Sequence, residues 1–189
     1  GTGLAGRRNH VRAFAQQRTY ALAALYPYAT QYAGGEWAFQ GEVRYTWARK
    51  TKMGGRYGTS LKLSAAHIRG LREEGSWAID TRTEGEYYTD VNLELNKRIT
   101  KRWWLNAMLM YQTYNRQLLE GHGELVRSGI AVMDTRVQVN KDISMRGELQ
   151  YLYTPHYQGQ WVFALCELSL YRYVTLSGQW MYNIGGAAE

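Results

Sequence analysis

The stretch WAFQGEVRYTWA, residues 37–48, decides the fold class. Apolar and aromatic side chains recur at every second position from Trp37 to Trp47, broken only by Gly41, and polar or small side chains such as Glu42 and Arg44 fill the positions between them. Successive side chains of a β-strand point to opposite faces, so a period of two collects the large apolar groups on one face. The stretch therefore predicts a strand with one apolar and one polar face.

The same alternation recurs in segments along the chain as far as Tyr182, with turn-like residues between them. A weaker first strand is expected between Arg18 and Leu25. Segments of about 10–12 residues exceed the roughly 5–6 of soluble sheets and match the roughly 9–11 of a tilted membrane strand. They predict an all-β, antiparallel up-and-down meander of about 8–10 strands. We expect a transmembrane β-barrel, or part of one, as a single domain over residues 1–189.

The connections between the segments alternate in length. Long connections are expected at residues 27–35, 69–85 and 118–129, and short ones at residues 98–101 and 141–144. Bacterial outer-membrane barrels alternate long external loops with short periplasmic turns, which is the same arrangement. A soluble barrel with one open end would show it too.

The aromatic composition favours a boundary between apolar material and water. The chain has 16 Tyr and 7 Trp but only 3 Phe, so most rings carry a polar group. Such rings form the aromatic girdles of membrane proteins. No stretch reaches the roughly 18 apolar residues that a membrane helix needs, so a helical membrane protein is not expected.

The net charge of +7 lies in short basic clusters at the ends of the periodic segments, where solvated turn residues are expected. A nucleic-acid-binding protein usually combines a basic stripe with exposed aromatic side chains, whereas these aromatic residues lie within the strand pattern. We therefore expect no nucleic-acid partner. The single Cys166 excludes an internal disulfide and a zinc site with several cysteines.

In a membrane barrel the apolar rows would face lipid and the polar rows the lumen. The lipid-facing candidates are Trp37, Phe39, Val43, Leu61, Leu63, Val91, Leu93, Leu105, Leu109, Val137 and Leu149. The lumen candidates are Glu42, Arg44, Lys62, Asp90, Glu94, Arg136, Arg146 and Glu148. Their balance of signs favours pairing across strands over strong ion selectivity.

The sequence offers no recognisable catalytic machinery. The four histidines are scattered and do not pair at metal-ligand spacing: His10, His67, His122 and His156. The glycines of residues 54–58 lead into a strand and lack the Lys-Ser/Thr and helix of a phosphate-binding loop. Ser60 and Ser64 lack the glycine pattern of a nucleophile elbow, and Glu73 and Glu74 suit a solvated loop. We expect a non-enzymatic protein with no catalytic, cofactor-binding or metal-binding residue and no cofactor, although a constellation of distant residues stays open.

Several stretches also resemble a known family. They are TYALAALYPYATQ from Thr19, GGRYGTSLKLSAAHIRGL from Gly54, MRGELQYLYTPHYQGQWVFALCELSL from Met145 and MYNIG from Met181. From about Asn9 onward the chain resembles the Bacteroidetes proteins known as domain of unknown function 6029. The resemblance implies an outer-membrane barrel of unassigned role and brings no catalytic residues. Because family members are longer at both ends, and the chain stops at Glu189 without a terminal aromatic strand, we expect a fragment of a longer barrel.

Two hypotheses follow. The first is a non-enzymatic barrel of the bacterial outer membrane that serves as a pore, anchor or scaffold, surrounded by outer-membrane lipid and open to contact with other outer-membrane proteins. The alternative is a soluble β-barrel or sandwich that binds an apolar or carbohydrate ligand, with its aromatic rows packed inward. The position of Trp37, Leu63, Leu93 and Leu109, on an exposed belt or in the centre, separates them.

Overall fold

The computed structural model describes residues 19–28, 35–71, 77–80, 85–155, 159–170 and 173–185. These residues form eight strands and one short helix. In chain order they are β1 (Glu36–Trp47), β2 (Thr59–Gly70), β3 (Glu86–Arg98), β4 (Trp103–Asn115), α1 (Arg116–Leu119), β5 (Leu125–Gln138), β6 (Ile143–Tyr153), β7 (Gln160–Leu170) and β8 (Val174–Gly185).

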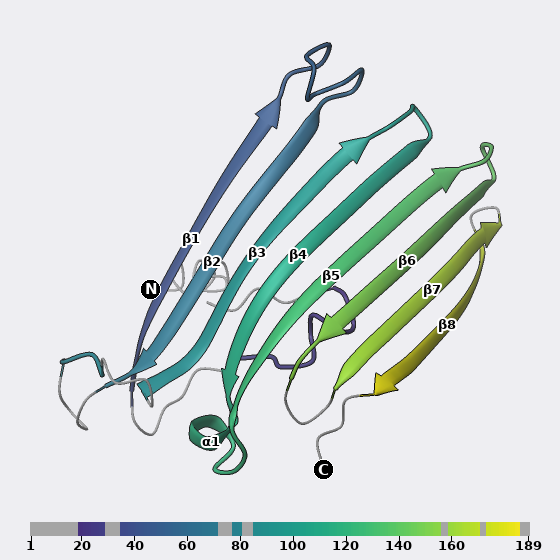
Figure 1. Ribbon diagram of the computed structural model, residues 1–189. Coiled ribbons are helices and arrows are strands. Elements are labelled where there is room, and N and C mark those ends of the chain that lie inside the picture. Colours follow the sequence, from purple (N-terminus) through teal and green to yellow (C-terminus); the bar gives the residue numbers. More distant parts are fainter. Residues whose placement is uncertain are drawn as a thin grey trace, which may run out of the picture.

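All eight strands belong to one curved sheet in which neighbours in the chain are neighbours in space (Figure 1). Every adjacent pair is antiparallel. The predicted all-β meander is therefore confirmed. Among the described strands β1 pairs only with β2, and β8 pairs only with β7, so the sheet is open, as part of a barrel would be.

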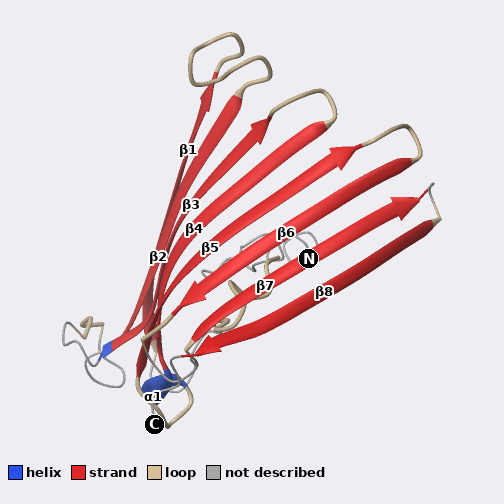
Figure 2. Cartoon of the chain, turned by 45° about the vertical axis from the view of Figure 1, so that its right-hand side comes forward, coloured by secondary structure: helices blue, strands red, loops and turns tan. Residues whose placement is uncertain are grey.

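The strands are long, from 11 to 14 residues. The loops at their two ends differ in length (Figure 2). At one end β3 joins β4 through residues 99–102, and β5 joins β6 through residues 139–142. At the other end residues 71–85 and 116–124 connect β2 to β3 and β4 to β5. These four connections agree with the predicted alternation, but residues 48–58, which join β1 to β2 at the end of the short turns, form a connection longer than residues 116–124. The first predicted long connection, residues 27–35, falls mostly outside the described residues.

The predicted loop at residues 118–129 is too long, because β5 already begins at Leu125. Leu125 pairs with Asn115, and the ladder continues from there without a register shift. The connection is residues 116–124 and begins with the single helical turn α1. Asn115 caps this turn, because its side chain accepts a hydrogen bond from the Leu118 backbone N–H. The glycines of residues 54–58 form a turn, as predicted. A Cβ on Gly54 would lie 2.0 Å from the carbonyl oxygen of Ala48, so only glycine fits there.

The strand predicted between Arg18 and Leu25 is wrong. Of these residues, 19–25 are described, and they form turns in which the Ala24 N–H donates to the Tyr20 carbonyl at 3.0 Å. Leu22 and Ala23 are adjacent in the chain and both buried. A strand would send two such neighbours to opposite faces, whereas a turn directs both toward one apolar surface.

Residues 19–28, which we call the inner segment, lie against one face of the sheet (Figure 1). We call this the inner face and the opposite one the outer face. The buried core forms between the inner segment and the inner face of β4–β7. Its members are Tyr20, Leu22, Ala23, Met108, Met110, Ile130, Val132, Leu152 and Phe163. No helix of the described residues is long and apolar enough to cross a membrane.

Candidate functional site

Direct register partners on neighbouring strands share a face, and side chains alternate between faces along each strand. By this rule every predicted lipid-facing residue lies on the outer face. One row of such partners crosses all eight strands and contains no charged side chain: Val43, Leu63, Leu93, Leu109, Ala131, Tyr151, Val162 and Tyr182. The parallel row beside it is also uncharged: Tyr45, Leu61, Leu95, Ala107, Met133, Leu149, Ala164 and Trp180. Val43 is 69% exposed and Leu109 62%. The sheet thus presents a broad, uncovered apolar band.

A polar row borders this band at one end. His67, Thr89, Thr113 and Arg127 are successive register partners on β2 to β5. His67 Nδ1 lies 2.8 Å from the Thr89 hydroxyl, and Glu86 accepts hydrogen bonds from Thr89 at 2.7 Å and Thr113 at 2.6 Å. His67 is therefore part of the hydrogen-bonded polar row at the edge of the apolar band.

The other border on β3 is Lys97, eight residues beyond Thr89. At about 3.4 Å per residue this separation is roughly 27 Å along the strand. For a strand tilted by about 40°, the height of the apolar band between the two borders is roughly 21 Å.

Aromatic rings gather toward the ends of the outer-face strands. Trp37 stacks on Phe39 with 6.0 Å between ring centroids, and Tyr45 meets Trp47 edge-on at 5.1 Å. The Trp103 indole N–H donates to the Thr135 hydroxyl at 2.7 Å. These rings combine apolar surface with polar atoms.

The inner face carries every predicted lumen residue, and most of them are paired. Lys62 on β2 lies 2.9 Å from Glu94 on β3, its direct register partner. On β1, Arg44 lies 3.7 Å from Glu42. Asp90 accepts hydrogen bonds from Tyr88 and Asn92, both at 3.2 Å. Lys62 and Glu94 thus form an ion pair across neighbouring strands, as the sequence predicted for the polar rows.

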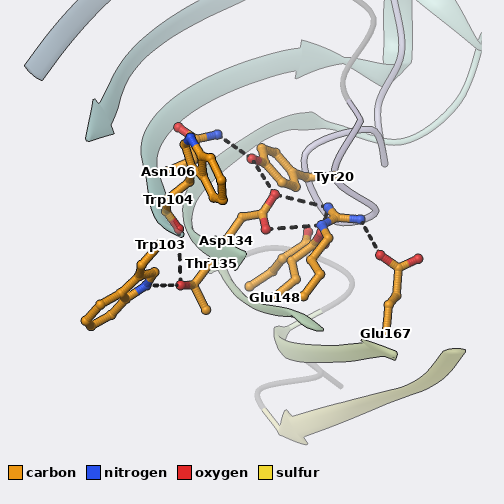
Figure 3. A network of polar contacts seen from close by, with 10 residues as sticks. Tyr20, Trp103, Trp104, Asn106, Asp134, Thr135, Glu148 and Glu167 are labelled. Carbon is orange, nitrogen blue, oxygen red and sulfur yellow. Dashed lines mark hydrogen bonds and ion pairs between the residues drawn. The ribbon is translucent and has the colours of Figure 1, made fainter. Parts of the chain in front are cut away.

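Arg146 on β6 is the centre of a polar network whose labelled members in Figure 3 include Asp134, Glu148 and Glu167. Its guanidinium contacts Asp134 at 3.1 Å, Glu167 at 3.0 Å and Glu148, so three carboxylates from β5, β6 and β7 surround one cation. Gln150 donates to Glu148 and accepts a 2.8 Å hydrogen bond from the Leu22 N–H. The network therefore joins the sheet to the inner segment.

Tyr20 connects the inner segment to this network from the other side. Its hydroxyl accepts a hydrogen bond from Asn106 Nδ2 at 2.5 Å and lies 3.5 Å from Asp134 Oδ2, to which it donates. Burial, assisted by the negative charge of Asp134, raises the pKa of Tyr20 to about 12. The hydroxyl accordingly stays protonated and remains a donor at neutral pH.

The residues considered for chemistry are not brought together in the described part of the chain. Ser64 is buried on the inner face, and His122 is exposed beside α1, where its Nδ1 lies 3.0 Å from the Glu120 carbonyl. In the described residues, no group of three or more His, Cys, Asp or Glu side chains is arranged to hold a metal ion. His10, His156, Glu73 and Glu74 lie outside the described residues.

The sequence of the chain matches a family of unknown function, DUF6029, over residues 2–189. The chain belongs to this family. The resemblance noted from Asn9 onward is therefore confirmed at the level of the family, and the DUF6029 match begins earlier in the chain. No curated protein and no solved structure matches it.

Some residues of the polar network around Arg146 were not predicted from the sequence. Asp134 and Glu167 occupy the same polar positions of their strands as Arg136 and Glu148, so alternation alone would have found them. Tyr20 was missed because its contact with Asp134 spans 114 residues of sequence. No local pattern indicates such a contact.

Proposed function

We propose that this chain forms a non-enzymatic β-barrel of the bacterial outer membrane, or part of one, in which the outer face meets lipid. The observation that carries the proposal is the apolar band of the outer face. Soluble monomers rarely expose contiguous apolar patches beyond a few hundred Å², because water makes such surface unfavourable. Here two uncharged rows run across all eight strands.

The height of the band also supports a membrane. Outer-membrane barrels carry an apolar band about 25 Å tall, edged by aromatic rings, on strands of about 9–11 residues. The band estimated here is roughly 21 Å tall. Trp37, Trp47 and Trp103 then serve as girdle residues at its margins. We propose that lipid surrounds this band in the outer membrane of a Bacteroidetes bacterium.

The contents of the inner face favour an anchor or scaffold over a wide pore. The inner segment packs its apolar side chains against β4 to β7. The three carboxylates around Arg146 form ion pairs with its guanidinium group. Large porins instead keep a water-filled lumen. Where the inner segment covers the sheet, less room is left for the passage of solutes.

The alternative, a soluble barrel or sandwich, needs its aromatic rows packed inward. Leu63 and Leu109 instead lie on the exposed outer face, at 47% and 62% exposure. This position favours the membrane barrel.

Lysine substitutions on the two faces test the proposal. A lysine at the bilayer midplane on a lipid-facing position costs about 2–4 kcal/mol, whereas one facing the lumen stays hydrated. We expect Leu63→Lys and Leu109→Lys to abolish folding into lipid vesicles, measured as loss of heat-modifiable gel migration. Gln40→Lys, at an exposed inner-face position of β1, is the matched control and should fold like the unmodified chain. Normal insertion of both outer-face variants, or recovery of the unmodified chain as a soluble monomer without detergent, would overturn the proposal.

A further inference from the structure

The inner face contains a cleft of about 750 Å³ that the inner segment does not line. It lies toward the end of the sheet where residues 99–102 and 139–142 form the short turns, and its lining comes mainly from β2 to β5. A volume of this size suits a ligand of two or three sugar rings, within the range of roughly 300–1,000 Å³ typical of small-molecule sites.

One cross-strand row supplies the charged and aromatic wall of the cleft. Arg98, Trp104 and Arg136 are successive register partners on β3, β4 and β5, so the indole stands between two arginines. The Arg98 guanidinium lies 5.0 Å from the centre of the Trp104 ring. Arg98 is held further by hydrogen bonds from Nε to the Thr100 carbonyl and from Nη2 to the Lys101 carbonyl, the first at 3.2 Å and the second at 2.6 Å.

Among the described residues, the two arginines of this row that line the cleft form no ion pair. Arg146 continues the same row on β6 and is matched by three carboxylates. By contrast, neither Arg98 nor Arg136 has a carboxylate partner among the described residues. Asp134 also lines the cleft, but its oxygens already accept from Arg146 at 3.1 Å. The described lining of the cleft therefore carries a net positive charge, and two of its guanidinium groups have no carboxylate partner in this part of the chain.

The adjacent row supplies neutral hydrogen-bonding groups. Thr46, Ser60, Asn96 and Asn106 are successive register partners on β1 to β4, and all line the cleft. Hydroxyl and amide groups both donate and accept hydrogen bonds, as sugar hydroxyls require. The indole of Trp104 adds an apolar wall against which the C–H groups of a sugar can pack.

We propose that this cleft binds an acidic saccharide, a short sugar chain that carries carboxylates. A carboxylate would be held by Arg136 and by Nη1 of Arg98, for which the described residues offer no hydrogen-bond acceptor. Guanidinium groups bind carboxylates through paired, charge-assisted hydrogen bonds. The row of hydroxyl and amide groups would bind the sugar hydroxyls. A simple anion would leave that row unused, and a neutral sugar would leave both arginines unpaired.

Calorimetric titration of the detergent-solubilised chain tests this assignment with three probes: trigalacturonate, the neutral maltotriose and inorganic phosphate. We expect saturable binding of trigalacturonate, and at least about tenfold weaker binding of the other two, because each lacks one set of contacts. Binding in detergent is independent of whether the outer face meets lipid, so failure here would leave the proposed membrane location untouched.

Substitution of Arg136 locates the binding. Arg136→Gln should weaken trigalacturonate binding by about tenfold, the usual effect of losing one charge-assisted hydrogen bond, and Arg136→Lys should lose less. The matched control is Arg44→Gln, which removes an inner-face arginine that does not line the cleft and should bind like the unmodified chain. Three results would each overturn the assignment: absence of saturable binding, equal affinity for trigalacturonate and either control probe, or unchanged affinity in Arg136→Gln.

Discussion

Arg146 and Asp134 are diagonal neighbours on adjacent strands and form a two-point ion pair. Arg146 Nε lies 3.1 Å from Asp134 Oδ1, and Arg146 Nη2 lies 3.1 Å from Asp134 Oδ2. Between β5 and β6 the direct register pairs combine like charges, because Asp134 faces Glu148 and Arg146 faces Arg136. Like charges directly opposite each other destabilise a sheet, so the diagonal pair compensates for the register.

Removal of Arg146 should therefore be costly. Arg146→Met leaves Asp134, Glu148 and Glu167 close together without their cation. Glu148 is buried and the other two are partly buried, and a buried group left without its hydrogen-bond partner costs about 1–3 kcal/mol, or more when it is charged. We expect a marked fall in the urea midpoint of unfolding in detergent. The control is Arg44→Met, whose pair with Glu42 is longer and more exposed and which should change the free energy of unfolding by less than about 1 kcal/mol. Equal effects of the two substitutions would show that Arg146 does not organise the inner face.

The Tyr20 hydroxyl makes the stability of the chain depend on pH in the alkaline range. Burial raises its pKa to about 12 in the folded chain, above the usual tyrosine value of about 10. A raised pKa means that the folded state favours the protonated form, so its contribution is fully present below pH of about 10 and is lost as pH rises through about 12. Tyr20→Phe should lower the free energy of unfolding by about 1–2 kcal/mol at pH 8. The difference between the two proteins should shrink between about pH 10 and 12, and a constant difference in chemical denaturation across that range would contradict the assignment.

The inner segment is held by burial of Leu22. Leu22 is 2% exposed between the sheet and the rest of the segment, whereas Leu25, three residues later, is 38% exposed. Leu22→Asp should release the segment, because an unpaired buried carboxylate costs several kcal/mol. Limited proteolysis should then cut within residues 19–28. Leu25→Asp is the matched control and should stay as resistant as the unmodified chain. Resistance of Leu22→Asp would mean that the segment is anchored mainly by other contacts.

The strands of this protein could be predicted from sequence because each one obeys a local rule. Alternation from Trp37 to Trp47 requires only that neighbouring side chains point to opposite faces. The same rule failed for residues 19–25, where Leu22 and Ala23 are buried together in a turn. The turns at residues 19–25 form because these residues pack against β4 to β7, which lie far away in the sequence. A short stretch of sequence does not show such distant contacts.

The candidate sites could be predicted only in part, for a related reason. Alternation assigned Arg136 and Arg146 to the same face but could not state their register. The register makes them direct partners and gives Arg146 three carboxylates while leaving Arg136 with none in the described structure. The cleft beside Trp104 depends on the same register over β3 to β5. A difference in role between two arginines ten residues apart thus arises from strand pairing.

The open edges of the sheet give the last prediction. Along β1 and β8, half of the backbone N–H and C=O groups point away from the only described neighbour, β2 or β7. Water can satisfy these groups, but hydrocarbon cannot, and each unsatisfied group costs several kcal/mol there. If the outer face lies in lipid, these edges must be hydrogen-bonded in the membrane.

Amide hydrogen exchange can detect that bonding. On transfer from detergent to lipid vesicles, we expect exchange in Glu36–Trp47 and Val174–Gly185 to slow by about tenfold or more, because unprotected amides become hydrogen-bonded. The turn at residues 139–142 is the internal control and should exchange equally fast in both environments. Fast exchange of both edge strands in vesicles, with β4 and β5 protected, would mean that the edges remain in water. The sheet would then lie on the membrane surface or outside it, contrary to the proposed barrel.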